Sequence, residues 1–547
     1  MALNSKKFED FAKAEGIADD IKILLPGLGR NERAFAREVG AIVGPLNVAF
    51  LHNDRVAQIY DEPLPLETKN NLDRNRLARG GLKFRTLTGV RTKGWIEQFL
   101  TTGTMIKELD DKGKPLLDEN GKAIWKFAEK TMSEDLARSL VENPFFRRQL
   151  PKISRILPVP VPILMSDGGI RMPRPGYNKE LEIYCALSSP PIRLLDIEQA
   201  IEVLKAAHLG FQFKNEQSRV HAHARFMTPF FRGIIGYSEP VPCWYFNANR
   251  PRCGKDYLAG VTQITYEGFA FEDAALGSNP EETRKRITAG LMGGRRSFHF
   301  ANCQGHLSDK YYIQAITDTM WRDRLLGSND SSSDLLVANE AEYSVSANVG
   351  LTYREDIEPR MRAIHLVFYE EDANSRIFPV EDLHGWVRTN RTLLLSALYT
   401  IFDYWQKKGM PLGHPFASYK RWGKILAGVM ALLELGNPTL PHEDQSLLSG
   451  DLRTEGMKAV YELIYDLRPE LWTPKKDIYQ IIAANQDNDD RLSWFGDLCG
   501  DTKKSAQTKL GKTISAFEDR VFSGITMRLD TSLTVARLWK VQFSRSP

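Results

Sequence analysis

The stretch CWYFNANRPRCGKDYLAGV (243–261) contains the pattern that decides the fold of this chain. An apolar run leads into a loop of turn-forming residues, Gly254-Lys255 follows, and an amphipathic helix is expected after it. This strand–loop–helix order is the setting that a phosphate-binding loop requires. Backbone N–H groups of the loop and of the helix N-terminus would hold phosphate oxygens. Lys255 would reach the β and γ phosphates, and Gly254 would let the backbone approach closely.

Two positions depart from the common pattern G-x-x-x-x-G-K-[ST]. Asn249 replaces the first Gly, which is a mild change because Asn tolerates positive φ better than most residues. Asp256 replaces the Ser or Thr hydroxyl that normally ligates Mg²⁺. Its carboxylate would ligate the metal directly or through water, but it adds negative charge beside the phosphates. Cys253 and Tyr257 complete the expected nucleotide-contacting set. The alternative is a Gly-Lys-Asp surface turn, since GK is a common dipeptide.

Further polar residues follow at the spacing that an ATPase needs. The segment RRSFHFANCQGHL (295–307) predicts a buried strand whose tip reads Ala301-Asn302, where a metal-ordering Asp would be expected. Asn302 can orient water but cannot act as a base or as a strong Mg²⁺ ligand. The segment EYSVSANVGLTY (342–353) predicts another strand, with the Asn348 amide placed to contact the γ phosphate or the attacking water. One of the arginines that follow would serve as an arginine finger. The candidates are Arg354, Arg360 and Arg362.

The bulk composition indicates a folded protein of several domains. With 547 residues, two to four domains are expected. Lys and Arg total 73 against 69 acids, and this net charge of +4 permits a nucleic-acid partner without demanding one. Five scattered cysteines without a CxxC pair argue against a zinc knuckle or a disulfide framework and favour the cytoplasm. No apolar run approaches a membrane span, and no signal peptide is expected.

Changes in pattern along the chain divide it into predicted domains. Turn clusters within 107–127 suggest β-hairpins, so residues 1–132 are expected to form an α+β accessory domain. A helical and Pro-rich collar would follow over 133–235. Strands and helices alternate over 236–380, which predicts a parallel sheet flanked by helices and hence an α/β P-loop core. Residues 381–467 are expected to form a helical subdomain.

The C-terminal unit, 468–547, has three helical segments followed by strands over 524–530 and 536–543, the order of a winged helix. Residues 501–547 contain nine Lys/Arg and four Asp/Glu. In the helix expected over 503–522, the apolar positions would face the core and the lysines would face DNA phosphates. The alternative is a solvated basic face on a packing domain. The predicted DNA-binding lysines are Lys503, Lys504, Lys509 and Lys512.

Taken in order, six segments resemble the ATPase domain of phage and mobile-element primase-helicases and their stand-alone relatives, which are AAA+ proteins related to the superfamily 3 helicases. The resemblance covers about residues 135–435. The segments are GKDYLAG (254–260), FANCQGHL (300–307), MWRDRLLG (320–327), SANVGLTY (346–353), EPRMRAIHL (358–366) and NSRIF (374–378).

This resemblance implies an oligomeric ring, usually a hexamer, that depends on ATP and Mg²⁺ and encloses a single nucleic-acid strand. It assigns Lys255 to the phosphates, Asn302 to the second motif, Asn348 to the first sensor and Arg360 to an inter-subunit arginine finger. It also makes the segment 324–340 a pore hairpin. The implied function is a helicase or translocase in the replication of a phage or mobile element, in the cytoplasm of a bacterial or archaeal host.

The implied partners are single-stranded DNA, with double-stranded DNA as a further candidate, and separate primase or replisome proteins. The family usually has a carboxylate at the position of Ala301. Together with Asp256, this departure supports an alternative in which the chain binds nucleotide but serves as a DNA-binding or assembly scaffold. A P-loop kinase or another NTPase unrelated to nucleic acid is the remaining alternative.

Overall fold

The computed structural model of the chain describes most of its length, and the ranges below refer to these residues. No helix among them is long and apolar enough to cross a membrane. The described residues are 21–27, 30–62, 81–249, 252–276, 279–304, 306–324, 334–347, 351–353, 357–368, 379–416, 418–441, 452–485, 490–492, 510, 514, 521–530 and 540–545.

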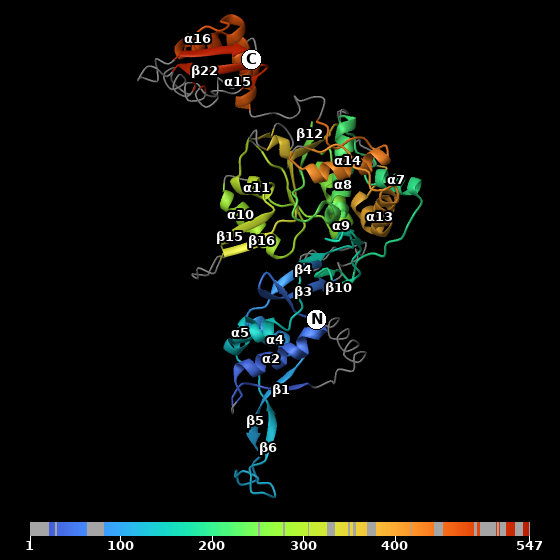
Figure 1. Ribbon diagram of the computed structural model, residues 1–547, viewed down its shortest axis with the longest axis vertical. Coiled ribbons are helices and arrows are strands. Elements are labelled where there is room, and N and C mark those ends of the chain that lie inside the picture. Colours follow the sequence, from blue (N-terminus) through green and yellow to red (C-terminus); the bar gives the residue numbers. More distant parts are fainter. Residues whose placement is uncertain are drawn as a thin grey trace.

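A four-stranded parallel sheet forms the centre of the fold (Figure 1). Its strands are β13 (Ser297–Phe300), β17 (Glu342–Ala347), β12 (Cys243–Ala248) and β19 (Met361–Leu366), in that spatial order. All neighbouring pairs are parallel. Nearly every residue of these strands is buried, as expected for a parallel sheet covered on both faces. The predicted mixed α/β fold with a parallel sheet is therefore confirmed.

Two hydrophobic clusters lie on opposite faces of this sheet. One contains residues of α8 (Glu216–Ile235), α9 (Lys255–Glu267), α13 (Arg391–Lys407) and α14 (Lys420–Leu432). The other contains residues of α10 (Pro280–Met292) and α11 (Lys310–Ala315). Alternate strand residues such as Trp244 and Tyr245 fall into different clusters, which follows from the two-residue period of a strand. Two shorter helices accompany the first cluster, α7 (Ile197–Ala206) and α12 (Leu383–Thr389).

Helices and strands of the N-terminal unit surround a hydrophobic cluster of their own. This cluster continues through Ala137, Phe146 and Leu150, beyond the boundary expected at residue 132. One sheet contains β1 (Lys22–Leu24), β5 (Thr101–Lys107) and β6 (Trp125–Glu129), and a second contains β2 (Phe50–His52), β3 (Arg55–Glu62) and β4 (Gly81–Thr86). The helices are α2 (Glu32–Val43), α4 (Gly89–Ile96), α5 (Glu134–Glu142) and α6 (Pro144–Arg147).

The two turns expected within 107–127 are present in an extension of the β5–β6 hairpin (Figure 1). The backbone N–H groups of Gly113 and Gly121 donate to the carbonyls of Asp110 and Asp118, each at 2.9 Å. Both glycines have positive φ, 75° and 74°, which explains why Gly occupies these positions.

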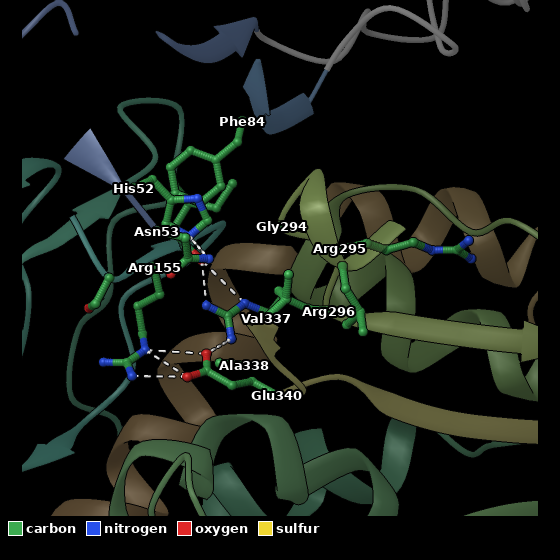
Figure 2. Close-up of a pocket in the computed structure, with 13 residues that line it drawn as sticks. His52, Asn53, Phe84, Arg155, Gly294, Arg295, Arg296, Val337, Ala338 and Glu340 are labelled. Atoms are coloured by element: carbon green, nitrogen blue, oxygen red, sulfur yellow. Dashed lines mark hydrogen bonds and ion pairs between the residues drawn. The ribbon is translucent and has the colours of Figure 1, made fainter. Parts of the chain in front are cut away.

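A junction of charged residues connects the N-terminal unit and the segment 133–235, predicted to be a collar, to the unit that contains the parallel sheet (Figure 2). Arg155 and Arg296 both contact Glu340, with Arg155 Nη2 at 2.9 Å from its Oε1. The backbone N–H of Phe84 donates to the carbonyl of Gly293 at 3.1 Å. The collar strands are β7 (Arg155–Leu157), β8 (Ile163–Leu164), β9 (Ile170–Arg171), β10 (Gly176–Asn178) and β11 (Ile183–Cys185).

The C-terminal unit has its own hydrophobic core, which includes Met457 and Ile464 of α15 (Leu452–Leu467). This helix therefore packs with the C-terminal unit rather than with the helical subdomain expected over 381–467. A sheet has the order β20 (Thr473–Pro474), β23 (Lys540–Arg545), β22 (Ile525–Asp530) and β21 (Val521–Phe522). Strand β22 lies inside the predicted strand 524–530, and the winged-helix identity of the unit remains a prediction. The unit also contains helix α16 (Lys475–Asn485) and a short 3-10 helix, Asp490–Leu492.

Candidate nucleotide-binding site

The loop between β12 and α9 is the segment in which the sequence predicts a phosphate-binding loop. Gly254 has φ 87° and is the N-cap of α9, a helix of 13 residues that begins at Lys255. Arg252 also has a positive φ, 68°. Asn249, expected to provide a left-handed backbone, instead pairs through its side chain. Its Nδ2 donates to the Phe368 carbonyl at 3.1 Å, and its Oδ1 accepts from the Phe368 N–H at 3.0 Å.

Lys255 lies at the centre of a polar cluster beneath this loop. Its Nζ donates to Asp256 Oδ2 at 2.8 Å and to Asn302 Oδ1 at 3.1 Å. Lys255 is only 7% exposed, so its ammonium group is held among fixed partners rather than in water. The sequence placed Lys255 and Asn302 in one site, and the structure brings them together from the first turn of α9 and the end of β13.

Asp256 accepts hydrogen bonds at both carboxylate oxygens. Oδ2 accepts from Lys255, and Oδ1 lies 3.0 Å from His299 Nε2 and also accepts from the Ser346 hydroxyl. Burial favours the neutral acid, but the hydrogen bonds from His299, Lys255 and Ser346 outweigh it and hold the pKa of Asp256 below its ordinary value. Asp256 is therefore an anion at neutral pH, directly beside the lysine expected to bind phosphate.

His299 is a member of the cluster that the sequence did not predict. It is 1% exposed and lies on β13 beside β17. Its Nδ1 lies 2.8 Å from Ser344 Oγ, and its Nε2 contacts Asp256. A histidine in an apolar strand usually indicates a satisfied core residue. The available signal was the alternation Ser344–Ser346 on the neighbouring predicted strand, which places hydroxyls on one face.

Asn302 adopts φ 56°, a left-handed conformation that Asn tolerates. Its backbone N–H donates to Ser346 Oγ at 3.0 Å, which fixes the turn after β13 against β17. Ala301 is buried, and its N–H donates to the carbonyl of Asp273 at 3.2 Å. The position where a carboxylate would be expected therefore faces a packed interior and offers only a methyl group.

Tyr257 and Cys253 have different environments within the loop. The Tyr257 ring is 40% exposed and stacks on His384, with ring centroids 3.6 Å apart. Its hydroxyl donates to Asp382 Oδ1 at 3.2 Å. Cys253 is buried, and its thiol lies 3.4 Å from Asn249 Oδ1. Tyr257 thus presents an aromatic surface near the loop, whereas Cys253 fills its interior.

Four other predicted features lie away from this cluster or outside the described residues. Arg360 precedes β19, and Met361 pairs with Cys243 at the start of β12, so Arg360 is at the opposite end of the sheet from Lys255. Asn348 lies outside the described residues, as do Lys503, Lys504, Lys509 and Lys512. The predicted pore segment 324–340 contains the second strand of a hairpin, β15 (Met320–Arg324) with β16 (Asp334–Ala338).

The oxygen donors of the cluster fit Mg²⁺, which prefers one or two carboxylates together with substrate phosphates and water. Asp256 supplies the carboxylate, with the Asn302 amide and Ser346 hydroxyl oxygens nearby. Among the described residues, no group of three or more His, Cys, Asp and Glu side chains has the arrangement of a dedicated metal cage. A metal here would therefore depend on the nucleotide for most of its ligands.

A cavity lies at the junction shown in Figure 2, and it is too small to hold a nucleotide. Its volume is about 40 Å³, and it is lined by His52, Arg155, Arg296 and Glu340 among others. His52 stacks on Phe84 with ring centroids 4.0 Å apart, and burial lowers its pKa to about 4. A space of this size suits ordered water between polar groups.

No family model matches the sequence, and no curated protein matches it. Among solved structures, the apo A form of the NrS-1 C-terminal region aligns with 77% of this chain and 92% of its own length, at 10% identity and a TM-score of 0.35. The active helicase Cch of SCCmec type IV aligns with 80% of this chain and 73% of its own, at 10% identity and a TM-score of 0.25. Drosophila ORC bound to DNA aligns with 65% of this chain and 91% of its own length, at 10% identity and a TM-score of 0.16. At these scores the likeness carries no weight for function, which depends on the site itself.

Proposed function

We propose that the chain is an ATPase that binds ATP and Mg²⁺ at the β12–α9 loop and acts on nucleic acid as a helicase or translocase. One observation carries the nucleotide-binding part of the proposal. Lys255 begins the helix that follows a buried parallel strand, and its ammonium group meets Asn302 from the end of a second strand. A lysine at this place, beneath a left-handed glycine, is the arrangement that holds β and γ phosphates.

Nucleotide binding would replace contacts that the site already contains. Phosphate oxygens would accept hydrogen bonds from the N-terminal N–H groups of α9, where the helix dipole favours negative charge. Lys255 would turn its ammonium group from Asp256 Oδ2 toward the phosphates. The closeness of Asp256 and Lys255, 2.8 Å, means that this carboxylate and the phosphates compete for one cation.

Magnesium would relieve that competition. A cation bound by Asp256 and by the phosphates neutralises the carboxylate, and Ser346 and Asn302 lie close enough to fix water around it. Asn302 would also orient the attacking water. Asn348 as a sensor of the γ phosphate and Arg360 as a finger toward a neighbouring subunit complete the proposed catalytic set.

The nucleic-acid part of the proposal comes from the resemblance of residues 135–435 to AAA+ replicative helicases of phages and mobile elements. The partner is single-stranded DNA inside a homo-oligomeric ring, with six subunits as the usual number. The β15–β16 hairpin is the proposed pore element, because β16 lies within the segment 324–340 and β15 leads into it. The basic lysines of the C-terminal unit are a second proposed DNA contact.

A second candidate function is a nucleotide-dependent scaffold with little or no hydrolysis. Its support is the buried methyl group of Ala301 in place of a carboxylate, together with the three protein donors that occupy Asp256. Both features weaken metal-assisted chemistry more than they weaken binding.

ATP turnover with and without single-stranded DNA tests the proposal. The intact chain is compared with Lys255→Ala and with Lys285→Ala, an exposed lysine on α10 that pairs with Glu282. A helicase or translocase is supported if single-stranded DNA stimulates ATP turnover and if Lys255→Ala abolishes this turnover while Lys285→Ala does not. ATP binding without turnover in the intact chain favours the scaffold, and equal ATP affinity of the intact chain and Lys255→Ala contradicts both.

A further inference from the structure

Three arginine side chains converge on one phenylalanine ring of the N-terminal unit. The guanidinium carbons of Arg33, Arg37 and Arg148 lie 4.2, 5.6 and 6.0 Å from the centroid of the Phe145 ring. All three arginines are exposed, and Phe145 is half-buried. These four residues are called the arginine patch. It lies on the surface formed by α2 and α6, apart from the sheet that contains the nucleotide site (Figure 1).

Local structure fixes the patch. Helix α2 buries Phe35 and Val39, so Arg33 and Arg37, four positions apart, share its exposed face. Arg148 is the C-cap residue of α6. The two helices approach closely because Gly40 has no side chain: a Cβ there would lie 2.9 Å from the Gln149 side chain. This close approach brings Arg33 and Arg37 of α2 to the Phe145 ring of α6.

Nearby carboxylates are engaged with other groups. Glu38 pairs with Arg30, Glu142 pairs with Arg147, and Glu32 accepts from the Ser139 hydroxyl. Within the described ranges, none of the three patch arginines forms an ion pair with a carboxylate. Three like charges gathered on one ring repel one another, and the ring face offsets this only in part. The patch is therefore electrostatically complementary to a ligand with several negative charges.

We propose that the arginine patch binds the phosphate backbone of single-stranded nucleic acid. Guanidinium groups are planar and donate paired hydrogen bonds that match phosphate oxygens. Arginine planes and aromatic rings are also the surfaces on which unpaired bases stack, a combination typical of single-strand binding. In this proposal, the N-terminal unit holds a single strand of nucleic acid outside the unit that contains the parallel sheet.

This contact needs neither nucleotide nor a functional ATPase, so its test is separate from that of the proposed function. Binding of a fluorescent oligothymidylate to the intact chain is measured without nucleotide, over a series of salt concentrations. The triple variant Arg33→Gln, Arg37→Gln, Arg148→Gln is expected to lose at least tenfold in affinity. Because each phosphate contact on a single strand contributes about 0.7 to the salt slope, the slope should fall by up to about 2. Lys255→Ala should bind the oligonucleotide as the intact chain does.

The matched control removes the same charge from the same unit. Lys112→Gln, Lys114→Gln, Lys122→Gln changes three exposed lysines on the extension of the β5–β6 hairpin and is expected to retain full affinity. The charge-conserving variant Arg33→Lys, Arg37→Lys, Arg148→Lys should keep the salt slope and show intermediate affinity. Thermal unfolding of each variant checks that the unit is folded.

Several results would overturn the assignment. Unchanged affinity in the triple glutamine variant removes the patch as a contact. An equal loss in the lysine control shows that net charge alone is responsible. Polyglutamate that competes as well as unlabelled oligonucleotide would show a site for acidic protein instead, and equal affinity for duplex DNA would remove the preference for a single strand.

Discussion

Glu340 and Glu342 are buried two residues apart at the amino end of β17, yet only Glu340 is ion-paired. Glu340 contacts the guanidinium groups of Arg155 and Arg296, whereas Oε1 of Glu342 has no hydrogen-bond partner among the described residues. Burial opposes ionisation of both, but the two arginines hold the pKa of Glu340 below its usual value. Burial raises the pKa of Glu342 to about 7, although Arg225 acts in the other direction.

The same substitution at these two positions should therefore have opposite effects on stability at pH 7.5. Glu340→Gln leaves two guanidinium groups without their carboxylate and is expected to cost about 3 kcal/mol. Glu342→Gln removes a carboxylate that is costly to ionise and should be stabilising by about 1–3 kcal/mol. Thermal unfolding monitored by calorimetry compares the two variants with the intact chain. A similar loss in both would contradict the assigned environments.

The two glutamates should also give stability opposite dependences on pH. For Glu342, whose pKa is raised on folding, the favourable contribution is complete below about pH 4.5. It is lost as the pH rises through about 7. For Glu340, whose pKa is depressed, the contribution is present above about pH 4.5 and is lost on acidification. The difference in stability between the intact chain and each variant, followed from pH 5 to 8, should change strongly only for Glu342→Gln.

Asp256 should weaken ATP binding when no divalent cation is present. Asp256→Asn removes a negative charge beside Lys255 while keeping nearly the same shape, and about tenfold tighter binding is expected in EDTA. The difference should shrink in Mg²⁺, because the cation neutralises the carboxylate in the intact chain. Titration of each protein with labelled ATP, once in EDTA and once in Mg²⁺, measures the two affinities. The control is Asp403→Asn, on α13 and paired with Lys407, which should change neither affinity.

Gly254 should be required for nucleotide binding and not only for folding. Gly254→Ala places a Cβ at φ 87°, 3.2 Å from the Phe211 ring, and should cost about 1–2 kcal/mol of stability. Gly113→Ala imposes a similar strain at φ 75° with nothing within 4 Å. Both variants are expected to lose comparable stability, but only Gly254→Ala should lose at least tenfold in ATP affinity. Equal ATP affinity in the two variants would mean that the loop does not hold phosphate.

The sequence predicted the strands and turns of the site better than it predicted which of them lie side by side. The apolar run before Gly254 and the buried strand that leads to the turn at Asn302 are both present, because strand and turn signals are local. The spatial order β13-β17-β12-β19 depends on pairings between segments far apart in the chain, which local patterns do not contain. His299 was missed for this reason, since its polar partners come from α9 and β17.

Asn249 shows a second limit of prediction from a motif. The sequence suggested that it serves the loop through its backbone conformation. In the structure its amide pairs with the backbone of Phe368, 119 residues away, and extends the contact between β12 and β19. The predicted boundaries at 132 and 467 failed to anticipate the packing of α5, α6 and α15, because an amphipathic helix does not reveal which neighbouring core it will join.

Along β17, Glu342, Ser344 and Ser346 alternate with Tyr343, Val345 and Ala347. Ser344 contacts His299, Ser346 donates to Asp256, and Glu342 is buried without a hydrogen-bond partner for its Oε1 among the described residues. Tyr343, Val345 and Ala347 lie in a hydrophobic cluster. A shift of one residue in the pairing would bring Tyr343 beside His299 and leave Asp256 without a hydroxyl donor, while the carboxylate of Glu342 entered an apolar core. An insertion or deletion of one residue within β17 would therefore disrupt the polar cluster and the hydrophobic cluster together.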